Sequence, residues 1–219
     1  MSLYQVNSSQ TQVHDQLALI VTKHQKTHYQ KPVPDRQYQL FKQAQSWFEQ
    51  QNRPILLDVG CGVGRSSVLL AKHYPDYAVV GIDKSLKRLQ RNVYYRDGLL
   101  DNLLLLPANC IDFWRLAVEE ELPIVKQYIL YPNPYPKTSD VTKRWHGHPI
   151  FPWLMAANST IELRSNWVVY LQEFAKAAQI VKPDIRCQWQ DISYHKESLT
   201  HFECKYQQAG ESIYQLILF

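Results

Sequence analysis

Hydrophobic positions along this chain follow two different periods in alternating segments. Short apolar runs that end in Gly, Asn or Asp are typical of buried strands, and apolar residues three and four positions apart are typical of amphipathic helices. The predicted strands are residues 55–60, 77–83, 102–109, 126–134, 159–166, 185–193 and 212–219. The predicted helices are residues 37–52, 66–74, 84–98 and 167–181, with a further helix between 134 and 159.

Strands that alternate with helices pair in parallel through right-handed crossovers. The pattern therefore predicts an α/β fold with a doubly wound, mostly parallel, seven-stranded sheet. The last two strands follow each other without a strong helix between them, which predicts an antiparallel edge strand. Residues 1–36 show no strong period and end in two prolines, which break helices. We expect residues 1–36 to form a basic, partly flexible arm and residues 37–219 to form one domain.

Composition narrows the class of protein. The chain has 219 residues, 45% of them hydrophobic, which suits one large globular core. Its four cysteines include no CxxC pair, so we expect no disulfide framework and no bound metal. No apolar run approaches the ~20 residues that span a bilayer, and the first residues lack the pattern of a signal peptide. The sequence predicts a cytoplasmic monomer or homodimer with no membrane segment.

The net charge of +4 is less informative than its distribution. Basic residues gather in two segments that also hold Tyr29, Tyr135 and Trp145, whose rings could stack on exposed bases. A nucleic-acid surface and an ordinary solvated face both remain open at this point. The two clusters consist of His14, Lys23, His24, Lys26, His28, Lys31 and Arg36, and of Lys137, Lys143, Arg144, His146 and His148.

A glycine-rich turn joins the first predicted strand to the helix that follows it. Its glycines, Gly60, Gly62 and Gly64, let the backbone turn sharply and approach a ligand closely. The spacing G-C-G-V-G is one residue short of the G-x-G-x-x-G pattern of dinucleotide-binding turns. Asp58 stands just before the glycines, where it would repel a pyrophosphate but tolerate the sulfonium and ammonium groups of S-adenosylmethionine. The turn therefore favours S-adenosylmethionine as the cofactor.

Two further polar residues end the next two strands. Asp83 ends the second strand and is placed to accept hydrogen bonds from both ribose hydroxyls, although a helix N-cap is the alternative role. Asn109 ends the third strand and could pair with the adenine edge, although an Asn at a strand end is also a common turn former. The carboxyl ends of parallel strands meet at one edge, so the sequence predicts one cofactor pocket.

The fourth strand leads into a loop with three prolines, Tyr-Pro-Asn-Pro-Tyr-Pro-Lys, at residues 131–137. Prolines on both sides hold the backbone of Asn133 extended, and the ring of Tyr135 could stack on a base. The loop resembles the Asn-Pro-Pro-Tyr loops of methylases that act on nitrogens of planar rings, with a structural turn as the alternative. We therefore assign Asn133 and Tyr135 as candidate catalytic residues.

Three segments behind the glycine turn resemble the tRNA (guanine-N7)-methyltransferase family. Residues 132–137 are similar to its Pro-Asp-Pro-Trp-(His/Pro)-Lys loop. Residues 165–167, Ser-Asn-Trp, are similar to its Thr-Asp-Trp after the fifth strand. Residues 199–203, followed by Gly210, are similar to its C-terminal Thr-Lys-Phe-Glu segment. The resemblance extends over residues 55–219.

The resemblance implies a Rossmann-like class I fold, S-adenosylmethionine as cofactor and tRNA as partner. It also implies roles for individual residues at the cofactor and at the guanosine. Three positions that are commonly aspartates in the family hold Asn109, Asn133 and Asn166 here. Because amides offer only a dipole to a guanine that becomes cationic, the acceptor atom stays open. The implied cofactor residues are Asp58, Asp83, Asn109 and Asn133, and the implied guanosine residues are Lys137, Asn166, Thr200, His201, Phe202 and Glu203.

The predicted reaction is a direct displacement at a base drawn out of its stack, driven mainly by alignment and exclusion of water. Asn133 would position cofactor or base, Tyr135 would pack on the base, and Lys137 and Arg144 would hold phosphate. Two alternatives are methyl transfer to a small molecule or a protein, and a non-catalytic module that binds RNA.

Overall fold

The computed structural model describes residues 6–27, 29–91, 100–195 and 197–219. The chain divides into two compact units. Unit 1 comprises residues 1–30, 131–156 and 160–219, and unit 2 comprises residues 31–130 and 157–159.

Seven strands form the sheet, in the order β3-β2-β1-β4-β5-β7-β6. This confirms the predicted seven-stranded α/β fold. The antiparallel strand is also confirmed: β7 runs antiparallel to both of its neighbours, and it lies between them, so that β6 is at the edge. The strand bounds are β1 Ile55–Val59, β2 Ala78–Ile82, β3 Leu103–Leu106, β4 Ile124–Leu130, β5 Thr160–Ser165, β6 Cys187–Asp191 and β7 Tyr214–Leu218.

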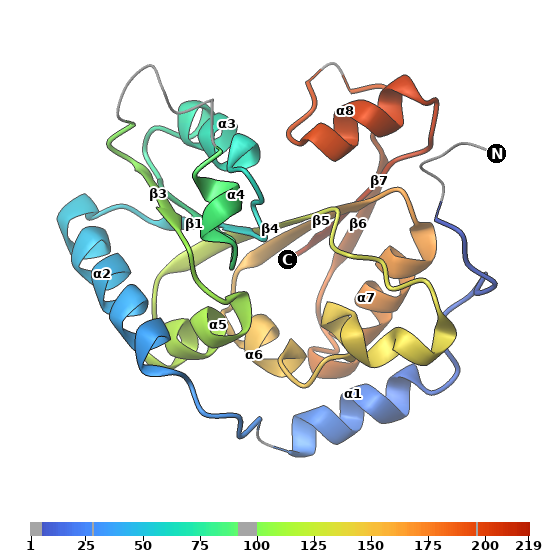
Figure 1. The fold of residues 1–219 in the computed structure, drawn as a ribbon. Coiled ribbons are helices and arrows are strands. Elements are labelled where there is room, and N and C mark those ends of the chain that lie inside the picture. Colours follow the sequence, from blue (N-terminus) through green and yellow to red (C-terminus); the bar gives the residue numbers. More distant parts are fainter. Residues whose placement is uncertain (1–5, 28, 92–99, 196) are drawn as a thin grey trace. The chain divides into compact units, whose positions relative to one another are not determined.

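Unit 2 contains four parallel strands, of which β1 and β2 are buried along their whole length. Helix α3 (Arg65–His73) follows β1 and packs close to β2. Helices α2 (Asp35–Gln51) and α5 (Cys110–Glu119) lie side by side (Figure 1), with the rings of Phe41 and Phe113 5.3 Å apart. Burial of both strand faces explains why the strand sequences are continuously apolar rather than alternating.

Unit 1 contains β5, β7 and β6, with helix α7 (Val168–Val181) as its main apolar helix. Helix α1 (Leu17–Lys26) lies beside α7 (Figure 1) and buries Leu17 and Val21. Two 3-10 turns, η1 (Thr138–Lys143) and η2 (Trp145–Gly147), and helix α6 (Phe151–Ala156) lie between residues 137 and 157.

Three helices differ from the sequence expectation, and one of them is α5, which lies between the third and fourth predicted strands where no helix was predicted. The interval before β7 contains α8 (His201–Gln208), which the weak apolar pattern there did not suggest. Helix α4 covers only Leu86–Leu89, and residues 92–98 of the predicted helix lie outside the described residues, as does His28 of the basic segment. Within the described part of the chain, no helix is long and apolar enough to cross a membrane.

Gly81 in β2 lies directly against α3. A Cβ at this position would be 2.2 Å from Ser67 Oγ and 2.7 Å from Leu105 Cδ2. We expect Gly81→Ala to lower the free energy of unfolding by about 1–3 kcal/mol, measured by urea denaturation, because the neighbours must shift.

A double-mutant cycle identifies the cause of this loss. Ser67→Ala removes the nearest atom, so the double variant Gly81→Ala/Ser67→Ala should lose less stability than the sum of the two single changes. Strict additivity would show that Ser67 is not the obstacle.

Candidate functional site

The glycine turn has the backbone that its sequence requires. Gly60, Gly62 and Gly64 have φ angles of 71°, 62° and 76°, the left-handed region that only glycine adopts without strain. The turn is anchored by the amide of Cys61, which donates to Ile82 O at 2.9 Å. Apart from each glycine and its two chain neighbours, no heavy atom of the described residues lies within 4 Å of a Cβ built at Gly60 or Gly62, so the turn faces open space at these two positions.

Asp58 lies beneath this turn and is almost completely buried, at 1% exposure. Its Oδ2 accepts hydrogen bonds from the hydroxyls of Ser66 and Ser67, both at 2.6 Å. Its Oδ1 is buried and has no hydrogen-bond partner among the described residues. Burial raises the pKa of this carboxyl to about 6, and the two serine hydroxyls oppose that rise. One acceptor oxygen is therefore held in place without a donor.

Asp83 is joined directly to the glycine turn, as the sequence predicted. Its Oδ2 accepts from the amide of Gly62 at 3.1 Å and lies 3.2 Å from the guanidinium of Arg88. Its Oδ1 accepts from the amide of Ser85 at 2.8 Å. The carboxylate is buried at 3% exposure, so its orientation is fixed before any ligand binds.

The start of α5 also contacts the turn. The backbone of Gly60 hydrogen-bonds the thiol of Cys110, whose pKa is raised to about 12, mainly by burial. Asn109 is the N-cap of α5: its Oδ1 accepts from the amide of Ile111 at 3.0 Å. This is the turn-forming role left open by the sequence, and it occupies the amide oxygen of the side chain that could pair with the adenine edge.

Unit 2 thus contains all the residues predicted for the cofactor except Asn133, which belongs to unit 1. The buried oxygen of Asp58 suits a cationic group, the open glycines suit close approach of a ligand, and Asp83 suits a ribose. These features fit S-adenosylmethionine, whose ammonium and sulfonium groups are both positive. No group of three or more His, Cys, Asp or Glu residues that could hold a metal ion occurs in the described ranges.

The proline-rich loop, residues 131–137, belongs to unit 1 and has an unusual backbone. Tyr131 and Tyr135 have positive φ angles of 52° and 44°, which are uncommon for residues other than glycine. The Oδ1 of Asn133 accepts from the amide of Tyr135 at 3.2 Å and closes a local turn. Asn133 and Lys137 are exposed, and Tyr135 is half-buried.

Arg144 lies where the sequence did not place it. We predicted that it holds phosphate, but its side chain is completely buried at 0% exposure. It forms an ion pair with Glu173 of α7, with NH1 and Oε2 2.5 Å apart, and its guanidinium lies 4.8 Å from the ring of Trp167. A buried, paired arginine cannot reach a phosphate, so its predicted substrate contact is corrected to a structural one.

Glu203 requires a similar correction. It was predicted to face guanosine, but it is completely buried and pairs with Arg164 NH1 at 2.8 Å. Arg164 also contacts Glu162 at 2.6 Å, so two carboxylates share one guanidinium. Thr200 is the N-cap of α8, and its hydroxyl accepts from the amide of Glu203 at 3.0 Å. Both residues therefore build α8 and the buried ion pairs beside it.

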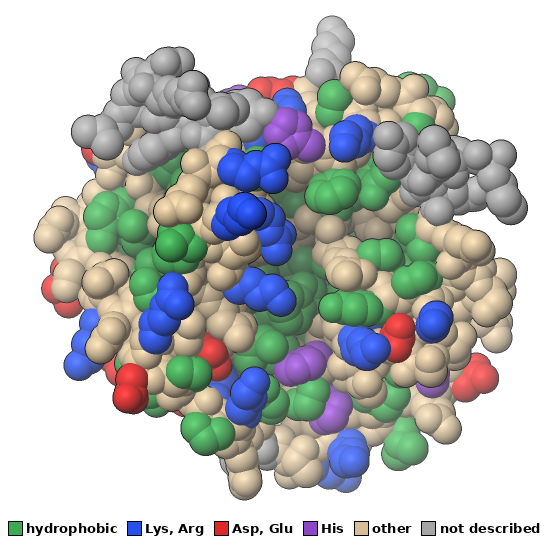
Figure 2. Space-filling view, viewed as in Figure 1, with side chains coloured by type: hydrophobic (Ala, Val, Ile, Leu, Met, Phe, Trp, Pro, Cys, Tyr) green, Lys and Arg blue, Asp and Glu red, His purple; other side chains and the backbone are tan. Residues whose placement is uncertain are grey.

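The remaining predicted substrate residues of unit 1 are accessible. Phe202 is 57% exposed, and its ring stacks on that of Tyr206 at 6.3 Å. His201, Lys137 and Lys143 are exposed, and Asn166 is half-buried between β5 and α7. Figure 2 shows basic side chains (blue) and histidines (purple) scattered among apolar ones (green) on one face.

Several residues of these sites escaped the sequence analysis. Ser66 and Ser67 give a signal in retrospect, because paired hydroxyls follow the glycine turn directly. Glu173 also gives one, since it is a carboxylate on the buried side of an apolar helix. Gln10 carries no local pattern, because its charged partners Arg144 and Glu173 are more than a hundred residues away. Arg164 pairs with the nearby Glu162 but also with Glu203, 39 residues away.

A family model described as "Putative methyltransferase" matches residues 52–216. This match covers well over half of the chain. The chain belongs to this methyltransferase family. Its glycine turn, Asp58 and Asp83 all lie inside the matched segment.

Three relatives share the name tRNA (guanine-N(7)-)-methyltransferase. The protein of Acinetobacter baylyi is 28% identical over 130 residues, which is 57% of this chain and 52% of the relative. Those of Alkaliphilus metalliredigens and Oceanobacillus iheyensis are 27% and 22% identical, covering 83% and 75% of this chain and 92% and 79% of the relatives. The matched segment thus spans about half the length of the first relative and most of the other two.

Solved structures show the same fold at low identity. An antibiotic-related methyltransferase has a TM-score of 0.60 at 16% identity, covering 81% of this chain and 92% of its own. An aminoglycoside-resistance methyltransferase has a TM-score of 0.56 at 17% identity, with the same coverage of both chains. A 16S rRNA (adenine(1408)-N(1))-methyltransferase from Catenulisporales acidiphilia, with SAM bound, has a TM-score of 0.51 at 18% identity over 80% of this chain and 89% of its own. At these identities, the similarities to solved structures show the fold alone.

The raised pKa of Asp58 makes cofactor affinity depend on pH. A cation favours the ionised carboxylate, so we expect affinity for S-adenosylmethionine to fall as the pH drops below about 6. Asp58→Asn should bind on the order of ten- to a hundredfold more weakly at neutral pH and lose this dependence. Calorimetry from pH 5.5 to 8 measures both effects.

The stability of the folded protein should change with pH in the direction opposite to cofactor affinity: it should fall as the pH rises. Burial holds the pKa of Asp58 in the folded protein at about 6, above the ordinary range of an aspartate, so its ionisation costs the folded state stability as the pH rises through about 6. Asp58→Asn should therefore be more stable than the wild type at pH 8, by up to about 3 kcal/mol. Asp76→Asn, at an exposed carboxylate of the same unit, is the control. Unchanged cofactor affinity in Asp58→Asn would contradict the assignment.

Proposed function

We propose that this protein is an S-adenosylmethionine-dependent methyltransferase that modifies a ring nitrogen of an RNA base, with guanine N7 of tRNA as the acceptor. The observation that carries the proposal is the buried Asp58 carboxylate with one oxygen lacking a donor, beneath a glycine turn tied to Asp83. The names of the tRNA-modifying relatives support the choice of substrate.

Unit 2 supplies the residues that hold the cofactor. S-adenosylmethionine, when bound, supplies an electrophilic methyl group on a sulfonium. Asp58 offers its unpaired oxygen to the positive end of the ligand, and the glycine turn leaves room for the ligand against the main chain. Asp83 accepts from the ribose hydroxyls while the Gly62 amide keeps it oriented. Because these groups are fixed in advance, alignment costs little when the ligand binds.

The chemistry of guanine N7 suits a loop without a general base. N7 has a free lone pair, so no proton has to be removed before methyl transfer. The amide of Asn133 and the ring of Tyr135 can therefore orient a base without removing a proton from it. Their positions in a tightly turned, proline-rich loop favour a fixed orientation.

A buried excess of negative charge could stabilise the cationic product ring. Glu162 and Glu203 share one guanidinium, that of Arg164, so the cluster carries one net negative charge when both are ionised. Tyr131, the first residue of the proline-rich loop, packs 5.4 Å from Tyr206 of α8. Burial and then the charge of Glu203 raise the pKa of Tyr131, which places this charge beside the loop. In this proposal the cluster substitutes for the aspartates that the family has at three other positions.

Methyl transfer tests the proposal directly. We expect purified protein to transfer radiolabelled methyl from S-adenosylmethionine to bulk tRNA, with 7-methylguanosine detected by mass spectrometry of the nucleosides. Asp83→Ala should abolish incorporation, because the ribose loses its acceptor. Incorporation only into 16S rRNA, or into protein or small molecules, would show that tRNA is not the substrate. Cofactor binding without incorporation into any of them would favour a non-catalytic RNA-binding module.

Phe202 offers a second test, on the RNA side. An exposed ring stacks on a base with about 1–3 kcal/mol, so Phe202→Ala should raise the KM for RNA by roughly ten- to a hundredfold and leave cofactor affinity unchanged. Tyr194→Ala removes another exposed ring, at 96% exposure, and is the matched control. Equal effects of the two substitutions would contradict a specific stacking role.

A further inference from the structure

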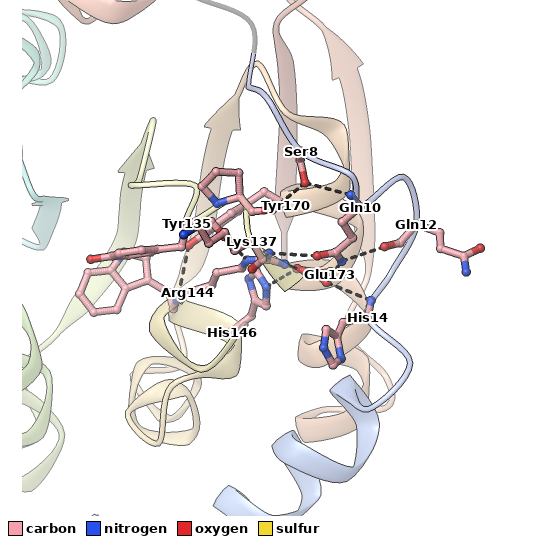
Figure 3. A network of polar contacts seen from close by, with 12 residues as sticks. Ser8, Gln10, Gln12, His14, Tyr135, Lys137, Arg144, His146, Tyr170 and Glu173 are labelled. Carbon is pink, nitrogen blue, oxygen red and sulfur yellow. Dashed lines mark hydrogen bonds and ion pairs between the residues drawn. The ribbon is translucent and has the colours of Figure 1, made fainter. Parts of the chain in front are cut away.

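A buried polar network in unit 1 links the N-terminal segment to the proline-rich loop (Figure 3). We define residues 8–14 as the strap. The network is centred on Arg144 and Glu173, whose side chains are both at 0% exposure, together with the equally buried His146. Gln10 of the strap is 9% exposed and contacts both charged side chains. Segments more than a hundred residues apart in sequence therefore meet at one ion pair.

Three consecutive carbonyls of the loop are held by this network. Arg144 donates to Tyr135 O through Nε and NH2, at 3.2 and 3.0 Å, and to Lys137 O through NH2 at 3.2 Å. The carbonyl between them, Pro136 O, accepts from the hydroxyl of Ser8 at 2.6 Å. Since Tyr135 has a left-handed backbone, these bonds stabilise a conformation that the residue would not favour alone.

The strap also completes the hydrogen bonding of the central ion pair. Gln10 Oε1 accepts from Arg144 NH2 at 3.0 Å, and Gln10 Nε2 donates to Glu173 Oε1 at 2.6 Å. The amide of His14 donates to the same oxygen at 3.0 Å. The other oxygen, Oε2, receives Arg144 and the Nε2 of His146 at 2.8 Å. Both carboxylate oxygens therefore have two partners each.

The charges in this network balance. Burial would raise the pKa of Glu173, but His146 and Arg144 outweigh it and lower that pKa to about 2. Burial lowers the pKa of His146, so the neutral ring donates its Nε2–H to the carboxylate. A buried ion pair of this kind depends on its additional hydrogen bonds, because each lost partner leaves a desolvated group without compensation.

We propose that the strap is a positioning element for the loop, with Gln10 and Ser8 as the residues that fix Tyr135, Pro136 and Lys137 in place. This inference rests on the proposed function only in treating the loop as the place where the base is oriented. Gln10 acts through Arg144 and touches no substrate, so it is a positioning residue rather than a catalytic one.

Gln10→Ala tests the strap without requiring activity. It should remove one hydrogen bond from Arg144 and one from Glu173, and thereby loosen the loop. We expect hydrogen–deuterium exchange in a peptide covering residues 131–143 to become severalfold faster, with a cooperative melting transition retained. Gln12→Ala is the matched control, because its side chain is exposed and only its backbone oxygen takes part, accepting from Gln10 at 2.8 Å.

Ser8→Ala is the second variant, in case Gln10→Ala does not fold. It removes two partly buried hydrogen bonds, one to Pro136 O and one from the amide of Gln10, so the fold should survive while exchange at the loop still increases. Ser9→Ala, at an exposed neighbour, is its control. Unchanged exchange at the loop in folded Ser8→Ala and in any folded Gln10→Ala would overturn the proposal. Because exchange needs no substrate, this result stands even if the protein methylates nothing.

Kinetics separate positioning from general structural support. With an active wild type, Gln10→Ala should lower kcat on the order of tenfold while the KM for S-adenosylmethionine stays unchanged, because small displacements of positioning groups slow chemistry. The double variant Gln10→Glu/Glu173→Gln exchanges amide and carboxylate across one contact and should recover part of kcat. Equal losses in kcat for Gln10→Ala and Gln12→Ala would contradict the inference.

Discussion

The burial of one carboxylate, that of Asp58, is the constraint on which the structure of unit 2 depends. Asp58 stands at the end of a strand buried on both faces, where only two serine hydroxyls from the next helix compensate its charge. Helix α3 must pack close to β2 for the Ser67 hydroxyl to reach Asp58. This close packing requires glycine at position 81. The three left-handed glycines then carry the main chain over the carboxylate. Strand β1, the glycine turn and helix α3 are thus arranged around the Asp58 carboxylate, whose burial in ionised form costs the folded protein stability.

Unit 1 uses buried charge differently from unit 2. Glu173 and Arg144 are neutralised locally, and their hydrogen bonds serve the backbone of the proline-rich loop. Glu162, Arg164 and Glu203 leave one carboxylate in excess. The first network holds backbone carbonyls of the loop, and the second provides the electrostatic field that the proposed function assigns to it. Replacing aspartates by Asn133 and Asn166 is compatible with such a division, because the amides can orient a base while buried glutamates supply the field.

Patterns local in sequence predicted the fold well. The predicted segments overlap all seven described strands, although β6 is mostly polar, and the glycine spacing with Asp58 favoured S-adenosylmethionine, because these signals lie within a few residues. Arg144 and Glu203 were misjudged for the opposite reason. A basic residue in a polar loop and a glutamate in a polar run both resemble surface charges, and only partners 29 and 39 residues away bury them. Helix α8 was missed because it buries little apolar surface.

The position of β7 between β5 and β6 also constrains the order of assembly during synthesis. Strand β6 leaves the ribosome before β7, yet β7 is its neighbour in the sheet. Until β7 has been synthesised, the backbone N–H and C=O groups of β6 that pair with β7 are exposed to water. The exposed side chain of Trp189 adds an apolar group to this unpaired strand. A nascent chain paused at this stage would be vulnerable to aggregation, which gives translation speed over these residues a direct effect on yield.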